Sequence, residues 1–257
     1  MSLSLLDRLT LFVHPQRVVI ERQPWRGTIS QQQADVALPV AGEADWQPAL
    51  TAAETLLKAH GQRGAVLRIV VADHFVRYAL LPWSDVLVTR KARQGMALAL
   101  LKNALGDKAN ALEIAIDRPA FARNGIAAGI DRQLLADLRV TAKVQRLRLN
   151  SLQPRLIAEL AARRKDLGNG WFACIDHGWL TLAGLRSGDI GCLHNHRATT
   201  SDPAMLSGEL RGLLVAESAA VKTKKLFVCS GDVATPTLAD DWEITRWPGV
   251  IAGAAHA

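Results

Sequence analysis

The chain has 257 residues, of which 49% are apolar and 21% are charged, a balance typical of a globular protein with enough apolar material for a core. This composition excludes a disordered or collagen-like chain. The 31 basic residues outnumber the 24 acidic ones and give a formal net charge of +7. A positive net charge makes nucleic acid, an anionic membrane surface and an acidic protein the candidate partner classes.

The first 162 residues predict strands and helices in alternation. Asp131 and Ser151 each precede a run of apolar residues at helical spacing, and both are good helix caps. Short apolar runs bounded by Pro, Gly or polar residues predict the strands. In chain order we expect a hairpin from strands 9–13 and 18–21, a strand near 36–40, a helix over 46–60, strands 65–71 and 75–81, a mostly buried helix over 89–105, strands 112–116 and 125–130, a helix after 131, a strand over 144–149 and a helix after 151.

The polar, glycine-containing segment 163–170 predicts a domain boundary. We therefore expect a first domain over residues 1–167 and a smaller second domain over residues 168–257. Because strands precede alternating helices and strands on both sides of the boundary, the sequence predicts an α/β fold in two halves of related plan. The second half is expected to contain strands 171–175, 180–185 and 190–193, a helix that begins at Asp202 and Pro203, and strands 226–229 and 242–245.

The cysteines and the amino terminus bear on the cellular compartment. Cys174, Cys192 and Cys229 are few, odd in number and widely spaced, which favours a reducing compartment over a disulfide framework. No apolar run approaches the roughly 18 residues of a membrane span. Asp7 and Arg8 interrupt what would be the apolar part of a signal peptide. We expect a cytoplasmic protein.

The excess positive charge is concentrated in residues 118–165. Eleven basic and three acidic residues give this segment a charge of +8, whereas the other 209 residues sum to −1. Single-strand binding usually adds aromatic side chains to such charge, and Phe121 is the only aromatic residue of the segment. The pattern predicts solvated faces, with a face for an anionic lipid surface or an acidic partner as the functional alternative, and it disfavours nucleic acid.

One run of the second half has residue types that could bind a metal ion. Cys192, His194 and His196 alternate along a predicted strand, so their side chains point to the same face. Zinc could take these ligands with His177 or Asp176 as the fourth. The chain lacks the Cys-x-x-Cys pairs of structural zinc sites, so we predict a solvated strand edge and keep these residues as weak metal candidates only.

Motifs of the common catalytic and nucleotide sites are absent from the sequence. Ser230 is preceded by Val228 and Cys229, so Ser230-Gly231-Asp232 lacks the Gly-x-Ser-x-Gly pattern of a nucleophile elbow. No P-loop or Rossmann glycine pattern is present. We assign no catalytic residue.

The string Asp73-His74-Phe75-Val76-Arg77-Tyr78-Ala79-Leu80-Leu81-Pro82-Trp83 resembles one in bacterial proteins of the actin-like superfamily. These relate to the inner-membrane platform component of type IV pili and to the cytoplasmic domain of the type II secretion L protein. The order of predicted elements agrees with that resemblance along most of the chain. It implies two actin-like (ribonuclease H-like) α/β halves with mixed sheets. Like the other tryptophans that border predicted strands, Trp83 is expected in the core.

The resemblance also implies where a nucleotide would bind. In the superfamily, two hairpins built on Asp-x-Gly hold the phosphates, and a late glycine pair supports the adenosine. The first hairpin here has His14 and Pro15 at that place. The second keeps Asp176 and Gly178, followed by the bulky Trp179, and the late motif is reduced to Ser230 and Gly231. These four residues are the candidate cofactor contacts, and ATP with Mg²⁺ is disfavoured.

From the resemblance we expect a cytoplasmic actin-like scaffold, a degenerate nucleotide-binding fold without enzymatic activity. Its expected partner is the tail of an inner-membrane protein, or another component of pilus biogenesis or type II-like secretion. The basic segment 118–165 would then face an anionic membrane surface or that partner, peripheral to the inner membrane. An active ATPase or small-molecule kinase of the same fold is the alternative, and a basic nucleic-acid-binding protein is the second alternative.

Overall fold

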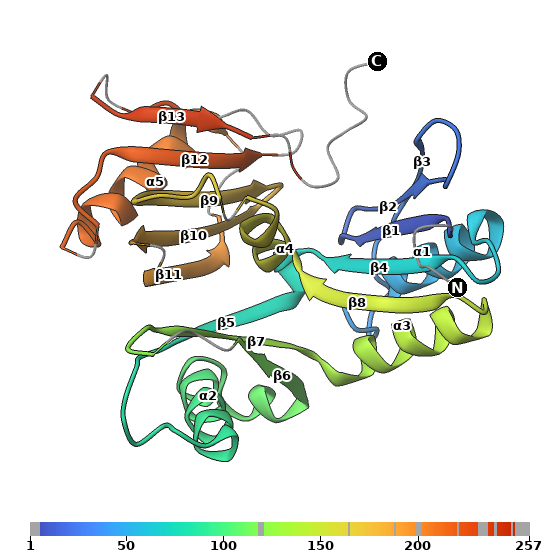
Figure 1. The fold of residues 1–257 in the computed structure, drawn as a ribbon, viewed down its shortest axis with the longest axis horizontal. Coiled ribbons are helices and arrows are strands. Elements are labelled where there is room, and N and C mark those ends of the chain that lie inside the picture. Colours follow the sequence, from blue (N-terminus) through green and yellow to red (C-terminus); the bar gives the residue numbers. More distant parts are fainter. Residues whose placement is uncertain are drawn as a thin grey trace. The chain divides into compact units, whose positions relative to one another are not determined.

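A computed structural model describes residues 6–117, 121–163, 165–187, 189–198, 202–219, 221–230, 236–238, 241–247 and 249. Within the described residues the chain separates into two compact units, each built from two stretches of sequence. Unit 1 contains the described residues up to Val76 and Ile130–Ala158, and unit 2 contains Arg77–Gly129 and the described residues from Glu159 onward. Figure 1 shows the elements of both units.

The centre of unit 1 is a mixed sheet with the strand order β3-β2-β1-β4-β8 in the described part of the chain. β1 pairs with β2, and β2 with β3, in antiparallel register. β4 and β8 add in parallel on the other side of β1. The strands are β1 (Arg8–Val13), β2 (Arg17–Gln23), β3 (Ser30–Asp35), β4 (Val66–Val71) and β8 (Arg148–Pro154).

Two helices, α1 (Gln47–His60) and α3 (Arg132–Val144), contact the unit 1 sheet and each other, and they lie on the same side of it in Figure 1. α3 begins where predicted, because the Asp131 carboxylate accepts hydrogen bonds from the backbone N–H groups of Gln133 and Leu134. Such a cap satisfies donors that the first helical turn leaves open. Leucines of both helices and of the strands form the core between helices and sheet.

Residues between β4 and α3 form a small sheet with a helix. Its strand order in the described residues is β5-β7-β6, and its core includes Leu81, Ala97 and Ala127. The elements are the 3₁₀ turn η2 (Asp73–Phe75), β5 (Val76–Leu81), α2 (Arg90–Leu105), the 3₁₀ segment η3 (Gly106–Ala111), β6 (Leu112–Ile116) and β7 (Gly125–Asp131). The small sheet is thus inserted, along the sequence, between two strands of the unit 1 sheet.

The larger sheet of unit 2 repeats the plan of the unit 1 sheet. Its order in the described residues is β11-β10-β9-β12-β13, with two antiparallel pairings on one side of β9 and two parallel pairings on the other. A helix, α5, connects the third and fourth strands of the plan, as α1 does in unit 1. The elements are α4 (Arg155–Ala162), β9 (Gly170–Asp176), β10 (Trp179–Arg186), β11 (Asp189–Arg197), α5 (Pro203–Ala216), β12 (Lys225–Ser230) and β13 (Glu243–Arg246). The predicted α/β fold in two halves of related plan is confirmed.

Trp171 is almost fully buried in the core of this sheet and packs with side chains from β10, β12 and α5. The strands approach closely at Gly184, which pairs with Cys192 of β11. A Cβ atom on Gly184 would lie 2.6 Å from the Cys192 Sγ and 3.2 Å from the Trp171 Cζ3. The core therefore requires a residue without a side chain at this position.

Two predicted elements lie elsewhere than expected. The strand expected near 36–40 is β3, at Ser30–Asp35, where polar side chains pair with β2 as an edge strand without an apolar pattern. Ser151 does not cap a helix, because it lies within β8 opposite Arg68 of β4, and α4 begins only at Arg155. Pairing with a buried parallel strand thus outweighs the local capping signal.

Two burial expectations also need correction. The helix expected to be mostly buried is α2, of which only Ala97 and Leu101 are buried among the described residues, because it covers a small sheet on one side. Trp83 is not in the core, since its side chain is 45% exposed after the end of β5. The boundary expected between residues 167 and 168 remains a prediction about where the second actin-like half begins. The two units are defined by contacts, and they divide the chain after Val76, Gly129 and Ala158 instead.

Candidate functional site

The tip of the β1–β2 hairpin, at His14, is the first of the predicted nucleotide elements. The His14 ring is buried, stacks on Phe12 with ring centroids 5.8 Å apart, and meets the edge of the His74 ring at 4.7 Å. Its Nδ1 atom accepts a hydrogen bond of 3.1 Å from the backbone N–H of Gln16. Strand pairing on both sides of the turn places this imidazole inside unit 1.

This hairpin offers few backbone donors to a phosphate. Pro15 has no N–H group, and the N–H of Gln16 is already bonded to His14. Phosphate-binding turns use several backbone N–H groups that point at the anion. The His14-Pro15 sequence therefore removes two donors from the tip, one by its covalent structure and one by a local hydrogen bond.

The β9–β10 hairpin contains two of the predicted cofactor residues, Asp176 and Gly178. The Asp176 carboxylate is buried and accepts a 2.9 Å hydrogen bond from the backbone N–H of His177. Gly178 has a φ of +66°, which lets the chain reverse in two residues. Its carbonyl accepts a 3.0 Å bond from the N–H of Ala198. The Asp176 carboxylate thus already accepts the hydrogen bond of the His177 N–H, which a phosphate in this turn would need.

Ser230 lies at the same edge of the unit 2 sheet as this hairpin. It ends β12 and pairs with Ile175, the residue before Asp176, in a parallel register. Beside the turn, the Arg77 guanidinium lies 5.1 Å from the centre of the Trp179 ring. The structure therefore brings Asp176, Gly178 and Ser230 to one sheet edge, while Gly231 lies outside the described residues.

The weak metal candidates Cys192, His194 and His196 all lie in β11. The two histidines contact carboxylates in α5 and just after its carboxyl end. The Nε2 atom of His194 lies 3.1 Å from Oε1 of Glu217, and that of His196 lies 2.7 Å from Oε1 of Glu209. Burial, with a smaller contribution from Glu217, raises the pKa of the Cys192 thiol to about 11. Metal binding needs the thiolate. The carboxylate contacts account for both histidines without a metal ion.

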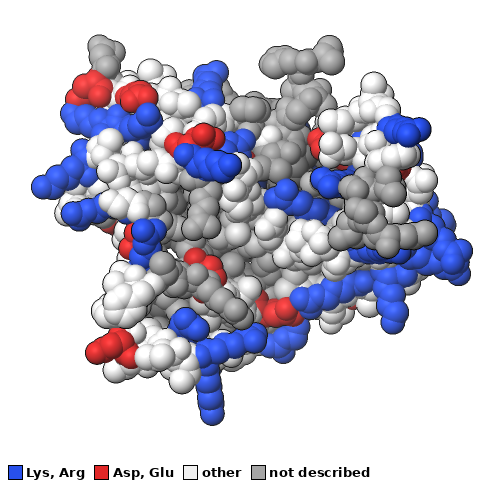
Figure 2. All heavy atoms as spheres, viewed as in Figure 1, with Lys and Arg blue, Asp and Glu red and all other residues white. Residues whose placement is uncertain are grey.

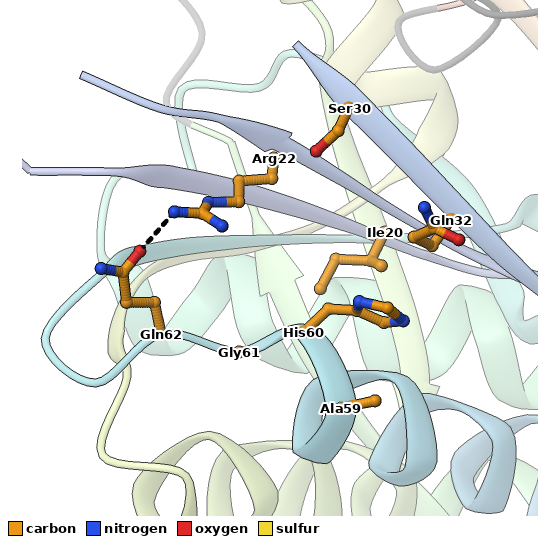
Figure 3. A pocket seen from close by; sticks show the side chains of 8 residues that line it. All are labelled: Ile20, Arg22, Ser30, Gln32, Ala59, His60, Gly61 and Gln62. Atoms are coloured by element: carbon orange, nitrogen blue, oxygen red, sulfur yellow. Dashed lines mark hydrogen bonds between the residues drawn. The ribbon is translucent and has the colours of Figure 1, made fainter. Parts of the chain in front are cut away.

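A polar pocket of about 370 Å³ lies in unit 1 where β2 and β3 face the carboxyl end of α1 (Figure 3). An Arg22 Nη2–H donates a 2.7 Å hydrogen bond to Gln62 Oε1 across it. The same guanidinium is bonded to the Asp7 carboxylate, so its charge is already neutralised. No sequence motif marks this pocket, because its residues meet only when β2 and β3 pair. Its remaining lining residues are Ile20, Ser30, Gln32, Ala59, His60 and Gly61.

Replacing Asp7 by asparagine is expected to lower the free energy of unfolding by about 1 kcal/mol at pH 7. Hydrogen bonds from the Trp25 N–H and from Arg22 hold the pKa of Asp7 below its usual 3.8. A carboxyl group with a lowered pKa stabilises the fold above about pH 4 and loses that effect as the pH falls through its folded-state pKa. Urea unfolding of both proteins at pH 7 and at about pH 3 should show the difference shrinking; an equal difference at both values would contradict this account.

The basic segment 118–165 does not form one face. Arg155 is buried in unit 1 with its guanidinium 5.8 Å from the centre of the Phe12 ring, and Arg163 is bonded to the buried Glu159 in unit 2. Figure 2 shows the Lys and Arg side chains gathered over α3, at the lower right. The exposed basic side chains of unit 1 within the segment are Arg132, Arg139, Lys143, Arg146 and Arg148.

Known proteins resemble this chain in fold but not in sequence. No protein family and no curated protein matches the sequence. The cytoplasmic domain of EpsL, an inner-membrane component of the type II secretion system of Vibrio cholerae, is similar with a TM-score of 0.61 and 11% identity, over 96% of this chain and 91% of that one. A Bacteroides thetaiotaomicron protein with an actin-like ATPase fold and unknown function gives 0.60 and 10%, over 95% and 91%.

The PilM–PilN type IV pilus biogenesis complex also contains a similar chain, with a TM-score of 0.60 and 13% identity, over 88% of this chain and 82% of that one. An inorganic polyphosphate/ATP-glucomannokinase from Arthrobacter gives 0.51 and 10%, over 94% and 92%. The fold is therefore actin-like, as the sequence resemblance implied. No helix among the described residues is long and apolar enough to cross a membrane.

Proposed function

We propose that this chain is a cytoplasmic actin-like scaffold, peripheral to the inner membrane, that binds a membrane-protein tail in pilus biogenesis or type II-like secretion. The observation that carries the proposal is the likeness of the whole chain to the EpsL cytoplasmic domain and to the PilM–PilN complex. The exposed face of α3, with Arg139, Val140, Lys143 and Val144, supports contact with an anionic lipid surface or an acidic partner.

The proposal includes a degenerate nucleotide site. Pro15 lacks an N–H group, and the N–H groups of Gln16 and His177 are bonded within their own hairpins. Both phosphate-binding turns would thus have to give up local hydrogen bonds before they could hold a nucleotide. If one binds, Asp176, Gly178, Ser230 and Gly231 are the residues expected to contact it.

The proposed function predicts that Mg-ATP neither binds measurably nor raises the midpoint of thermal unfolding. A ligand at about 100 times its Kd would stabilise the folded state by about 2.7 kcal/mol, a shift that differential scanning fluorimetry resolves. Isothermal titration calorimetry of the full chain with Mg-ATP is the direct measurement. Binding with a micromolar Kd would favour the active ATPase or small-molecule kinase, whose fold the glucomannokinase shares.

The proposed function also predicts that the chain binds a membrane protein. Full-length tagged chain, added to detergent extracts of inner membranes from the cells that produce it, is expected to recover a membrane protein with a short cytoplasmic tail. That tail, made as a synthetic peptide, should then bind the purified chain. Recovery of nucleic acid with a steep salt dependence would instead favour the second alternative.

A further inference from the structure

Three loops meet at the end of unit 1 where β4 and β8 begin, at the right of Figure 1. They connect β2 to β3, α1 to β4, and α3 to β8. Trp25 in the first loop donates its backbone N–H to Asp7, and Arg22 joins that carboxylate to Gln62 of the second loop. A backbone hydrogen bond of 3.0 Å joins the second loop to the carbonyl of Arg146 in the third. We call residues 7–8, 22–30, 60–66 and 143–148 the loop end of unit 1.

The loop end is strongly basic. Its exposed arginine and lysine side chains are Arg8, Arg26, Arg63, Lys143, Arg146 and Arg148, and Figure 2 shows Lys and Arg side chains at this end, at the right of the view. Among the described residues, none of these six makes a side-chain hydrogen bond or an ion pair. Asp7, the one acid of the loop end, is paired with Arg22.

The acids beside the loop end do not cancel this charge. Glu21 of β2 lies one row further into the sheet, opposite Thr10. Burial raises the pKa of its carboxyl group and so disfavours the charged form. Glu54 of α1 accepts a 3.1 Å hydrogen bond from the hydroxyl of Thr141 in α3. The loop end therefore keeps a local excess of positive charge.

Arg146 occupies a backbone position that favours glycine. Its N–H donates to the carbonyl of Lys143, the N–H of Leu147 donates to that of Ala142, and its φ is +56°. Helices that end in this way place one residue in the left-handed region, where glycine is usual and any other side chain costs backbone energy. The helix ending alone would favour glycine here, so the arginine requires another explanation.

Exposed apolar side chains lie among these basic residues. Trp25 is 47%, Ile29 60% and Val144 67% exposed. The Arg26 guanidinium lies 4.2 Å from the centre of the Trp25 ring and covers one of its faces. Tryptophan is enriched at membrane–water interfaces, and basic side chains mixed with apolar ones are typical of protein surfaces that bind anionic bilayers.

We propose that the loop end of unit 1 binds an anionic phospholipid surface, with Trp25 and Ile29 in the interface and the six basic side chains at the head groups. The inference rests on the proposed function, which makes the chain peripheral to the inner membrane, and it names the contacting element and the lipid class. Single-stranded nucleic acid stacks its bases on open aromatic rings, whereas Arg26 covers Trp25. An acidic peptide with apolar side chains would need an apolar groove, and the pocket beside Gln62 is polar.

The test measures how much of the full chain sediments with vesicles of phosphatidylglycerol and phosphatidylcholine in equal parts, and with vesicles of phosphatidylcholine alone. We expect binding to the first kind that weakens as salt screens the charges, and little binding to the second. Arg63→Gln and Arg146→Gly should each weaken binding by about fivefold, and Trp25→Ser by about tenfold. Because glycine suits the left-handed position, the urea midpoint of Arg146→Gly should not fall, and its loss of binding cannot be ascribed to unfolding.

The matched controls are in unit 2. Lys102→Gln removes an exposed charge of α2, and Trp83→Ser removes a tryptophan that is 45% exposed; both should bind like the wild type. Vesicles with brominated acyl chains should quench the tryptophan fluorescence of the wild type more than that of Trp25→Phe. Equal binding to both kinds of vesicle, or wild-type binding by Trp25→Ser and Arg146→Gly, would overturn the proposal. So would binding of the wild type to polyglutamate or single-stranded RNA without binding to vesicles.

The membrane-protein tail that tests the proposed function is measured on the same variants. Trp25→Ser should lose vesicle binding and keep tail binding, since the two contacts are separate. A wild-type chain that binds the tail and no vesicle would overturn this inference alone. A chain that binds anionic vesicles and no tail would overturn the proposed scaffold and leave this inference standing.

Discussion

Replacing Arg163 by methionine is expected to lower the free energy of unfolding of unit 2 by about 3 to 5 kcal/mol. The guanidinium is paired with the carboxylate of Glu159, whose side chain is only 2% exposed. The Sγ–H of Cys229 also reaches that carboxylate, at 3.7 Å. Without Arg163 the fold would have to bury the Glu159 carboxylate without its guanidinium partner. Urea unfolding followed by tryptophan fluorescence reports the change, because Trp171 and Trp247 lie in the same unit.

The double variant Glu159→Leu with Arg163→Met is the matched control. Replacing a whole buried ion pair by apolar side chains of similar volume is often neutral, so the double variant should recover most of the stability that Arg163→Met loses. Arg163 also lies 5.4 Å from the centre of the Trp247 ring, and methionine keeps an apolar contact there. A double variant as unstable as the single one would assign the loss to packing and not to the buried charge.

Gly184→Ala is expected to destabilise unit 2 by about 1 to 3 kcal/mol through overpacking. The new Cβ would lie 2.6 Å from the Cys192 Sγ, 2.9 Å from the Val221 Cγ2 and 3.2 Å from the Trp171 Cζ3. None of these neighbours is the free end of a flexible chain, and all three residues are buried. The midpoint of urea unfolding should fall, and the near-ultraviolet signal of the tryptophans should change with it.

Gly208→Ala provides the opposite result in the same unit. Gly208 lies inside α5, and a Cβ built there would have no atom of the described residues within 4 Å apart from its chain neighbours and the backbone of its own helix. Alanine in an exposed helical position is more favourable than glycine by about 1 kcal/mol. Gly208→Ala should therefore raise the urea midpoint, and a similar loss of stability in both variants would show that glycine is needed for a reason other than space.

The alternating elements could be predicted from the sequence because each carries a local signal. The Asp131 cap, and Asp202 with Pro203, place the starts of α3 and α5 where the structure has them. β3 escaped prediction because an edge strand with solvent on its faces needs no apolar pattern. The helix cap predicted at Ser151 was wrong because β8 pairs with β4, and a contact between segments so far apart in the chain leaves no local sequence signal.

The candidate site could be predicted only in part. The Asp-x-Gly turn at Asp176 and Gly178 is a local pattern that the sequence displays, whereas the hydrogen bonds that occupy the N–H groups of His177 and Gln16 depend on side-chain geometry. The edge-to-face contact of Trp83 with Phe121 has no motif either, because a helix and a strand separate the two residues along the chain and they meet through tertiary folding. Residue types at fixed spacing cannot reveal such a contact.

The insertion of the small sheet between β4 and α3 also sets an order of events during translation. β4 emerges from the ribosome long before β8, its outer neighbour in the sheet. The small sheet β5-β7-β6 is made of consecutive segments and can form in that interval. Until β8 is synthesised, the open edge of β4 is a template for wrong pairing. The nascent chain therefore presents an unpaired edge of β4 for as long as residues 77–147 are being added.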